Sequence, residues 1–409
     1  MKKFLYLAAA VCGIPALTSC SGGDITESVE YMAVQTDGYK WGFVGKDGKQ
    51  ALEGEYDNAP SAVVNGYFSV LENDKYVLYK FDEKRPKAVA GCDELDYVGC
   101  FSGAYAPVTQ KDSRITIIDR DGKKVSELKP IGGHEITECY PYFTDDLLAV
   151  CNDEGKMGYV DKDGKAVIAL KYSSVTGFTG GVALVATGSY DDMKWMVIDK
   201  KGEKVMSLKK DATPIYFQGF DKSYLFATRD GAVGYYDKKG EYKKCPGKVS
   251  SVVDANKDCY VFRGENYEYG VLDYDGNSIL SAKFNSISLL ANGDIIAERD
   301  DKVIIYNAAG EEKTRLKGAE KFAYYPNFGI FGYEGSTYSM FDMSGERIRG
   351  TEFKVIGNDL SASSSVRSTY ADKNSATADE MVEVVEEPVE EIVEEVVADS
   401  VAVEEPYYY

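Results

Sequence analysis

Histidine is nearly absent from this chain of 409 residues, which contains one histidine and two tryptophans. The single histidine is His134, so a catalytic Ser-His-Asp or Cys-His arrangement would have to use it. It follows Gly132 and Gly133, and no nucleophile motif accompanies it. We therefore interpret His134 as a solvated loop residue and predict no catalytic residue from a motif.

Motifs for cofactors and metals are missing as well. The sequence has no phosphate-binding loop, no Gly-x-Gly-x-x-Gly between a strand and a helix, and no paired-histidine metal motif. No Cys-x-x-Cys spacing of a zinc site occurs. Asp161-Lys162-Asp163-Gly164 resembles the opening of a calcium loop, but the twelfth position is Tyr172, where such a loop needs a Glu. We predict a hairpin turn there, and no cofactor or metal for the chain.

Basic residues are missing from the end of the chain. From Asn374 to Tyr409 there are twelve Asp or Glu and no Lys or Arg, within a total net charge of −20. No basic face is evident elsewhere, which argues against a nucleic-acid partner. Like charge and few aromatics predict that residues 359–409 form a disordered acidic tail. Val389, Ile392, Val393 and Val396 fall at helical spacing, so folding of this tail on a partner is the alternative.

A long apolar run occurs at the start of the chain. Lys2 and Lys3 precede an almost wholly apolar stretch from Phe4 to Leu17, which is typical of a removed signal peptide, residues 1–19. Leu17-Thr18-Ser19-Cys20 resembles the lipobox of bacterial lipoprotein precursors. The resemblance implies cleavage before Cys20 and lipidation of its thiol. Two or three acyl chains would anchor the protein to a membrane durably; an ordinary secretory leader is the alternative.

The residues after Cys20 bear on location. Residues 20–30 are predicted to be a flexible tether, and Ser21, a residue other than Asp, resembles the pattern of outer-membrane sorting. Asp24, Glu27 and Glu30 resemble the acidic surface-export signal of Bacteroidetes lipoproteins. We therefore expect a lipid-anchored protein of the cell envelope at the outer membrane, facing either the periplasm or the surface.

A short pattern recurs along the middle of the chain. An aromatic or apolar residue, often followed by Gly, precedes two apolar residues, Asp, two variable residues and Gly; residues 157–164 read MGYVDKDG. The second unit, Tyr76 to Asp82, has lost the Asp and the final Gly of the pattern. Nine units at a near-constant spacing end at residues 48, 82, 122, 164, 202, 240, 276, 310 and 345.

Each unit predicts a β-hairpin. The Asp ends a strand and its carboxylate can accept a hydrogen bond from the backbone N–H two residues on, opening an Asx turn. The Gly supplies the positive φ that closes the turn. Another strand follows, for instance Lys165 to Ala169, and further strands such as Val182 to Ala186 lie between the turns. Three to four short strands per ~40 residues are typical of a propeller blade.

The fold class predicted is therefore all-β, with the repeats in residues 31–358. The Trp-Gly or Tyr-Gly pattern and the turn Lys171-Tyr172-Ser173 resemble the bacterial WG-repeat family, which implies a scaffold and no particular reaction. Trp41-Gly42 keeps the namesake pair, whereas Trp195 is followed by Met196. We favour a β-propeller with irregular blades near its N-terminal end; an open β-solenoid is the alternative. Nine blades exceed the usual number, so hairpins at the two ends could be shared or appended.

Six cysteines remain besides Cys12 and Cys20. An exported location permits disulfides, but most of the six lie among apolar strand residues, so buried thiols and one or more bridges are both open. These residues are Cys92, Cys100, Cys139, Cys151, Cys245 and Cys259.

Two functions from different classes follow. The first is a non-enzymatic binding or scaffold module, anchored to the membrane by its N-terminal lipid, with an envelope protein or glycan as partner. Its candidate binding surface is Tyr140, Tyr142, Tyr324 and Tyr325, which flank prolines at connections between units, although packing inside blades is the plainer interpretation of tyrosines at repeat positions. The second is a propeller-type glycan hydrolase with paired carboxylates in its central funnel, about 5–5.5 Å or about 6.5–9.5 Å apart.

Overall fold

A computed structural model describes residues 29–36, 39–189, 192–357 and 359–370. The signal peptide, Cys20, most of the tether and residues 371–409 of the acidic tail lie outside these residues, so the predictions for them stay predictions. Within the described ranges, no helix is long and apolar enough to cross a membrane.

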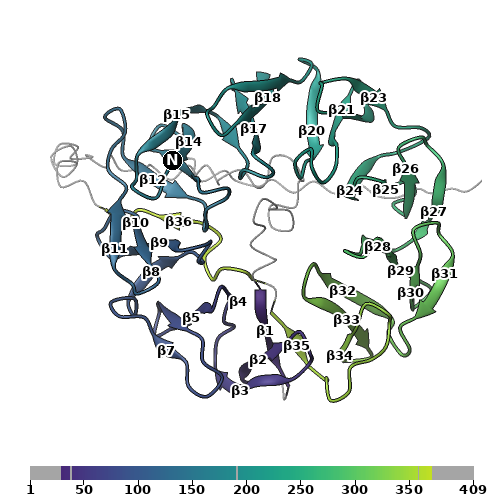
Figure 1. Cartoon of the computed structure of the whole chain (residues 1–409), viewed down its shortest axis with the longest axis horizontal. Coiled ribbons are helices and arrows are strands. Elements are labelled where there is room, and N and C mark those ends of the chain that lie inside the picture. Colours follow the sequence, from purple (N-terminus) through teal and green to yellow (C-terminus); the bar gives the residue numbers. More distant parts are fainter. Residues whose placement is uncertain (1–28, 37–38, 190–191, 358, 371–409) are drawn as a thin grey trace, which may run out of the picture. The chain divides into compact units, whose positions relative to one another are not determined.

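The described strands form nine blades arranged around a ring (Figure 1). Each blade is an antiparallel sheet whose first strand lies nearest the centre, and hydrogen bonds join blades 1 to 3 into one 12-stranded sheet. The prediction of an all-β propeller is confirmed. Blade 2 is irregular: its first and last strands, β4 and β7, contain two residues each. This is the blade whose turn motif is degraded in the sequence.

The strands of each blade follow from the inner to the outer edge. Blade 1 contains β35 (Val355–Ile356), β1 (Val29–Gln35), β2 (Trp41–Gly45) and β3 (Gln50–Tyr56); blade 2 contains β4 (Val63–Val64), β5 (Tyr67–Glu72), β6 (Lys75–Lys80) and β7 (Lys87–Ala88); blade 3 contains β8 (Leu95–Val98), β9 (Tyr105–Gln110), β10 (Thr116–Asp119) and β11 (Lys124–Glu127). Blade 4 contains β36 (Val366–Arg367), β12 (Ile136–Cys139), β13 (Leu148–Asn152), β14 (Met157–Val160) and β15 (Ala166–Tyr172); blade 5 contains β16 (Ser174–Val175), β17 (Val182–Thr187), β18 (Lys194–Asp199) and β19 (Lys204–Ser207); blade 6 contains β20 (Ala212–Tyr216), β21 (Leu225–Arg229), β22 (Ala232–Tyr236) and β23 (Tyr242–Lys244). Blade 7 contains β24 (Ser251–Ala255), β25 (Cys259–Arg263), β26 (Tyr269–Asp273) and β27 (Ser278–Phe284); blade 8 contains β28 (Ser286–Leu289), β29 (Ile295–Arg299), β30 (Lys302–Tyr306) and β31 (Glu312–Arg315); blade 9 contains β32 (Lys321–Tyr325), β33 (Gly329–Glu334) and β34 (Thr337–Phe341).

The two ends of the repeat region share blade 1. The C-terminal strand β35 pairs with the N-terminal strand β1, with Val34 opposite Ile356 and Gln35 opposite Val355. One hydrophobic cluster also contains Val34 of blade 1 and Phe331 of blade 9. The first and last blades are therefore neighbours, and the ring is closed rather than an open solenoid.

The turn that follows the third strand of a blade, with the added strand β36 of blade 4 not counted, has the predicted chemistry. In blade 4, one carboxylate oxygen of Asp161 accepts hydrogen bonds from the backbone N–H of Asp163 (3.0 Å) and of Lys165 (2.9 Å). Gly164 closes this turn with a φ of 74°. The prediction of Asx turns is confirmed, since the same pair of bonds recurs at Asp119, Asp199, Asp237, Asp273, Asn307 and Asp342.

The glycine of the Trp-Gly pair makes room for a bulge. In blade 1, Trp41 lies opposite Tyr56 and Phe43 opposite Leu52, so the outer strand has extra residues that arch over Gly42. A Cβ on Gly42 would lie 2.1 Å from the carbonyl oxygen of Leu52. Blades 4 and 7 repeat this irregularity in register. The motif therefore encodes a close approach of two backbones.

The core lies between blades, because each blade packs its side chains against the next. One cluster joins Leu184 and Trp195 of blade 5 to Leu225 and Tyr236 of blade 6. Each blade thus buries apolar side chains on both sides, which stabilises the ring by about 25 cal/mol per Å² of apolar surface removed from water.

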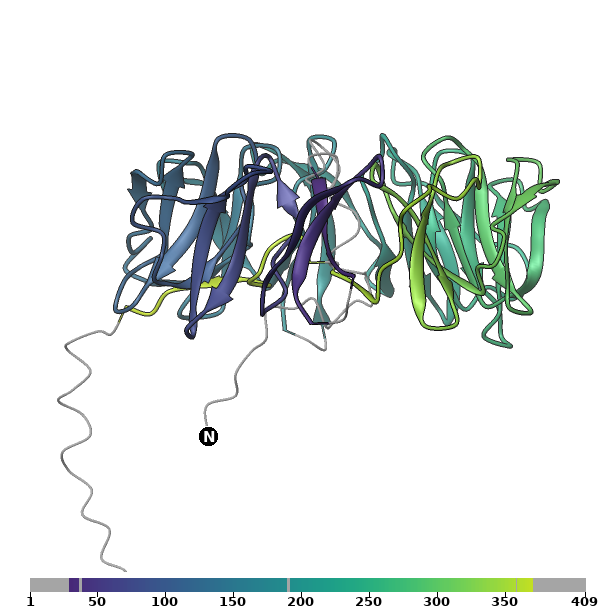
Figure 2. The ribbon, with the colours of Figure 1, turned by 90° about the horizontal axis from the view of Figure 1, so that it is seen from below.

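The ring has two faces, which Figure 2 shows edge-on. Because strands within a blade are antiparallel, the Asx turns between third and fourth strands all lie on one face, called here the turn face. The turns between second and third strands, together with the connections from one blade to the next, lie on the other, called here the link face.

Candidate functional site

The inner rim of the ring is formed by the first strand of each blade (Figure 1). In blades 5 to 9 this strand ends the sheet, so its inner edge has no strand partner among the described residues. Such an edge is a ready template for pairing with another extended chain. The inner rim is therefore the candidate functional site.

In blades 2 to 4 the chain itself covers this edge. Residues 359–370, called here the strap, run along the inner strands: the carbonyl of Asp359 accepts from Ala62 N–H at 2.8 Å, and the Ser363 hydroxyl accepts from Val98 N–H at 3.0 Å. The strap ends as β36, in which Val366 lies opposite Cys139 of β12. The structure here differs from the sequence prediction, which assigned residues from 359 onward to the disordered tail.

The end of the strap is also held by charged groups. The Arg367 guanidinium lies 3.3 Å from the carboxylate of Glu138. Glu138 belongs to β12 of blade 4 and is buried. The Arg114 guanidinium lies 3.9 Å from the ring centroid of Tyr370 and also pairs with Glu135 at 2.7 Å. These contacts fix the last described residues against blades 3 and 4.

In blades 6 to 9, where the strap is absent, side chains of the inner strands make hydrogen bonds to the backbone of the neighbouring blade. The Tyr216 hydroxyl of blade 6 accepts from Ala255 N–H of blade 7 at 3.1 Å. The Asp254 carboxylate of blade 7 accepts from Leu289 N–H of blade 8 at 2.9 Å. The Tyr324 hydroxyl of blade 9 accepts from Ala291 N–H, beside blade 8, at 3.0 Å. A series of polar side chains thus connects the inner strands of four successive blades.

Asp254 is the central group of this series. Its carboxylate is enclosed between blades, and burial raises its pKa from 3.8 to about 6, against the lowering effect of its hydrogen bonds to Leu289, Ala255 and Tyr216. Sequence analysis did not single out Asp254. The signal was an acidic residue inside an otherwise apolar strand, Val252-Val253-Asp254-Ala255.

The four tyrosines of the predicted binding surface lie on or next to inner strands. Tyr142 is buried, and Tyr140 donates a hydrogen bond from its hydroxyl to the carbonyl of Val175 in blade 5 at 2.7 Å. Tyr324 binds Ala291, as described, and the Tyr325 ring packs edge-on against Phe331 with centroids 5.5 Å apart. The first pair belongs to blade 4 and the second to blade 9, and all four side chains pack between blades.

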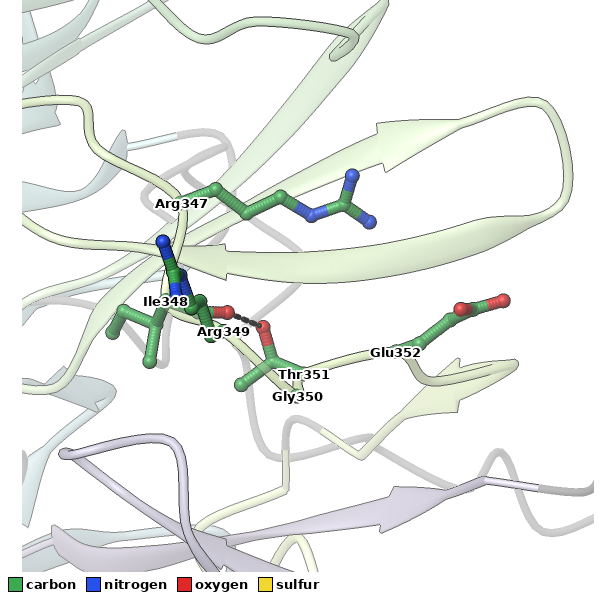
Figure 3. A pocket seen from close by; sticks show the side chains of 6 residues that line it. All are labelled: Arg347, Ile348, Arg349, Gly350, Thr351 and Glu352. Carbon is green, nitrogen blue, oxygen red and sulfur yellow. Dashed lines mark hydrogen bonds between the residues drawn. The ribbon is translucent and has the colours of Figure 1, made fainter.

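An open hollow lies along the segment that connects β34 of blade 9 to β35 (Figure 3), which begins where Arg347 pairs with Phe341 at the end of β34. It has a volume of about 530 Å³ and is lined by Arg347, Ile348, Arg349, Gly350, Thr351 and Glu352. The Thr351 hydroxyl donates to the Ile348 carbonyl at 2.7 Å and accepts from Met340 N–H at 3.0 Å, which fixes the base of the loop. Arg347 binds Ser339 and lies 3.4 Å from Glu334. The two arginines and Glu352 offer polar contacts and no arrangement for a reaction.

His134 lies in a surface turn of the link face. Its Nδ1 is 3.1 Å from the Asp153 carboxylate and its Nε2 is 3.5 Å from that of Glu154. In the part of the chain that the structure describes, no group of three or more His, Cys, Asp or Glu side chains is placed to hold a metal ion.

Among the described residues, the six cysteines outside the leader and lipobox form no disulfide with one another, so the structure favours buried thiols over bridges. Burial raises the pKa of Cys92, Cys151 and Cys245 to about 11, and that of Cys259 to about 12. At neutral pH these thiols are protonated and behave as small apolar side chains.

Comparisons with known proteins agree with the repeat and the fold. A family model described as "WG containing repeat" matches residues 41–76 and 157–189, so the chain carries WG-type β-repeats. A search of curated proteins finds no match.

Several solved structures resemble this chain in fold at low sequence identity. A chain titled as a eukaryotic initiation factor has a TM-score of 0.55 at 10% identity, covering 82% of this chain and 99% of that one. The C-terminal WD40 domain of Sif2 has a TM-score of 0.38 at 9% identity, covering 72% of this chain and 92% of that one. The WD40 β-propeller domain of Doa1 has a TM-score of 0.29 at 17% identity, covering 56% and 85%. At these identities the similarity concerns the fold alone.

Proposed function

We propose that this WG-type repeat propeller is the binding or scaffold module of a bacterial lipoprotein, anchored at the outer membrane through Cys20. The observation that carries the proposal is the sequence Leu17-Thr18-Ser19-Cys20, placed directly after a basic and then apolar leader. The partner is an envelope protein or glycan, which the ring meets without chemical turnover.

The use of charged groups on the inner rim supports a non-enzymatic role. Glu138 is paired with Arg367 at 3.3 Å, and Asp254 accepts from Leu289 N–H at 2.9 Å. Both carboxylates hold neighbouring segments of the ring, and a general acid or nucleophile would need to face a substrate instead.

Lipidation is tested by growing cells that express the full chain with an alkyne-bearing fatty acid and detecting the label on the purified protein. The expected result is label on the wild type, recovered with the outer membrane, and none on Cys20→Ala. Label that persists on Cys20→Ala, or a wild type without label, would contradict the anchor.

Binding is tested by crosslinking in intact envelopes, followed by purification of the chain and its partners. The full chain is compared with a chain that ends at Tyr370, which keeps the whole described ring. We expect both to capture the same partner, because the ring is the binding module. Capture that depends on residues 371–409 would assign recognition to the tail, and turnover of an envelope glycan by the purified protein would favour a hydrolase.

A further inference from the structure

The two ends of the described chain lie on opposite faces of the ring. At the start, Val29 pairs with Val64, and Tyr31 lies opposite Gly45, the first residue of the Asx-type turn of blade 1. Strand β1 therefore begins at the turn face and runs toward the link face.

The strap ends at the other face. Strand β36 runs antiparallel to β12, and the N–H of Thr369 donates to the carbonyl of Ser113 at 3.0 Å. Ser113 belongs to the turn between β9 and β10, a second-to-third-strand turn of the link face. The yellow end of the described chain accordingly reaches the lower edge of the ring in Figure 2.

We propose that the ring lies with its turn face toward the membrane, so that its link face points away from the membrane. This inference rests on the proposed lipid at Cys20. Eight residues lie between Cys20 and Val29, so the nine steps of the tether reach at most about 30 Å when fully extended. The tether joins the ring at Val29, on the turn face, whereas the link face lies a further strand length away, about 20 Å for six residues.

The link face carries the features suited to recognition. Tyr39 is 81% exposed and Tyr267 is 72% exposed, both in second-to-third-strand turns. The Arg263 guanidinium lies 4.4 Å from the Tyr267 ring centroid, so the ring is held in place with one side to solvent. The described chain also ends on this face, where the N–H of Thr369 donates to Ser113. In the proposed orientation these exposed side chains lie on the side of the ring away from the membrane.

Matched labels on the two ends of one strand test the orientation. Asp163→Cys places a thiol at the turn-face end of β14 and Glu154→Cys at its link-face end; both side chains are exposed. Asp275→Cys and Glu265→Cys form the same pair in blade 7. The native thiols are mostly buried, so a donor dye reacts with the introduced one. The lipidated full chain is then reconstituted into phosphatidylcholine vesicles that contain an acceptor-labelled lipid.

We expect higher energy transfer from Asp163→Cys than from Glu154→Cys, and from Asp275→Cys than from Glu265→Cys. Equal transfer within each pair, or the reverse order, on vesicle-bound protein would overturn the orientation and leave the anchor intact. Protein that carries no acyl chain and stays off the vesicles would overturn the anchor, and with it the orientation.

Discussion

At the scale of the residue, the repeated glycines allow a close approach of two backbones that leaves no room for a methyl group. In Gly158→Ala the new Cβ would lie 2.6 Å from the carbonyl oxygen of Ile168 and 2.8 Å from that of Ala169. Because both atoms belong to the backbone of the bulge, the outer strand must move. We expect the free energy of unfolding, measured with urea, to fall by about 1–3 kcal/mol.

Gly264→Ala is the matched control for this change. Its new Cβ would come no closer than 3.5 Å to Ala282, so we expect a change within about 0.5 kcal/mol. Equal losses in the two variants would show that loss of glycine flexibility, and not the close approach, sets the effect.

Asp254 makes stability depend on pH. Its pKa in the folded ring, about 6, lies above its ordinary value of 3.8, so the folded protein holds the proton more tightly than the unfolded chain does. The resulting stabilisation is complete below pH about 4 and is lost as the pH rises through about 6. In Asp254→Asn this dependence disappears, while the amide oxygen can still accept from Leu289. We expect the difference in the free energy of unfolding between the wild type and Asp254→Asn to change by at most about 3 kcal/mol between pH 4 and 7. If the two proteins show the same dependence of this free energy on pH, the raised pKa of Asp254 is contradicted.

At the scale of the element, a few buried contacts hold the strap against the inner strands of the ring. Val366 is fully buried and packs in a cluster with Ile136 and Val150 of blade 4. Val366→Ala removes two methyl groups there, and we expect a loss of about 1–3 kcal/mol in the free energy of unfolding. Tyr370→Ala, at the exposed end of the strap, is the comparison and is expected to cost less than about 1 kcal/mol. The reverse order would mean that the strap is held mainly by its end.

The sequence predicts the turns of this fold much better than the strap. The turn at Asp161 to Gly164 is specified by neighbours within five residues, so local reasoning finds it and its repeats. The strap contains Ser361, Ser363 and Ser365, a composition typical of a linker. Its strand-like path depends on partners such as Val98, which lies 265 positions from Ser363. Likewise, the positions of Tyr140 and Tyr324 at connections are visible in the sequence, but the blades that their hydroxyls bind are not.

At the scale of the whole molecule, ring closure depends on the strand that the C-terminal segment adds to blade 1. A chain that ends at Phe353 lacks β35 and the strap, which leaves the edge of β1 at Val34 and Gln35 open to other chains. We expect this variant to melt over a broader and lower temperature range and to form oligomers in light scattering. A chain that ends at Tyr370 keeps these contacts and is expected to melt within a few degrees of the full chain. Similar behaviour of the two would show that blade 1 closes the ring without β35.

The place of the strap in the chain also sets the order of events during synthesis. A ribosome releases the N-terminal blades first, yet the inner edges of blades 1 to 4 are completed by residues 355–370, and Arg367 meets Glu138 across 229 positions. Contacts of such separation form late, because the intervening chain must be brought together first. The first blades to be made are thus the last to be finished, and the chain stays an incomplete ring until its final segment has emerged.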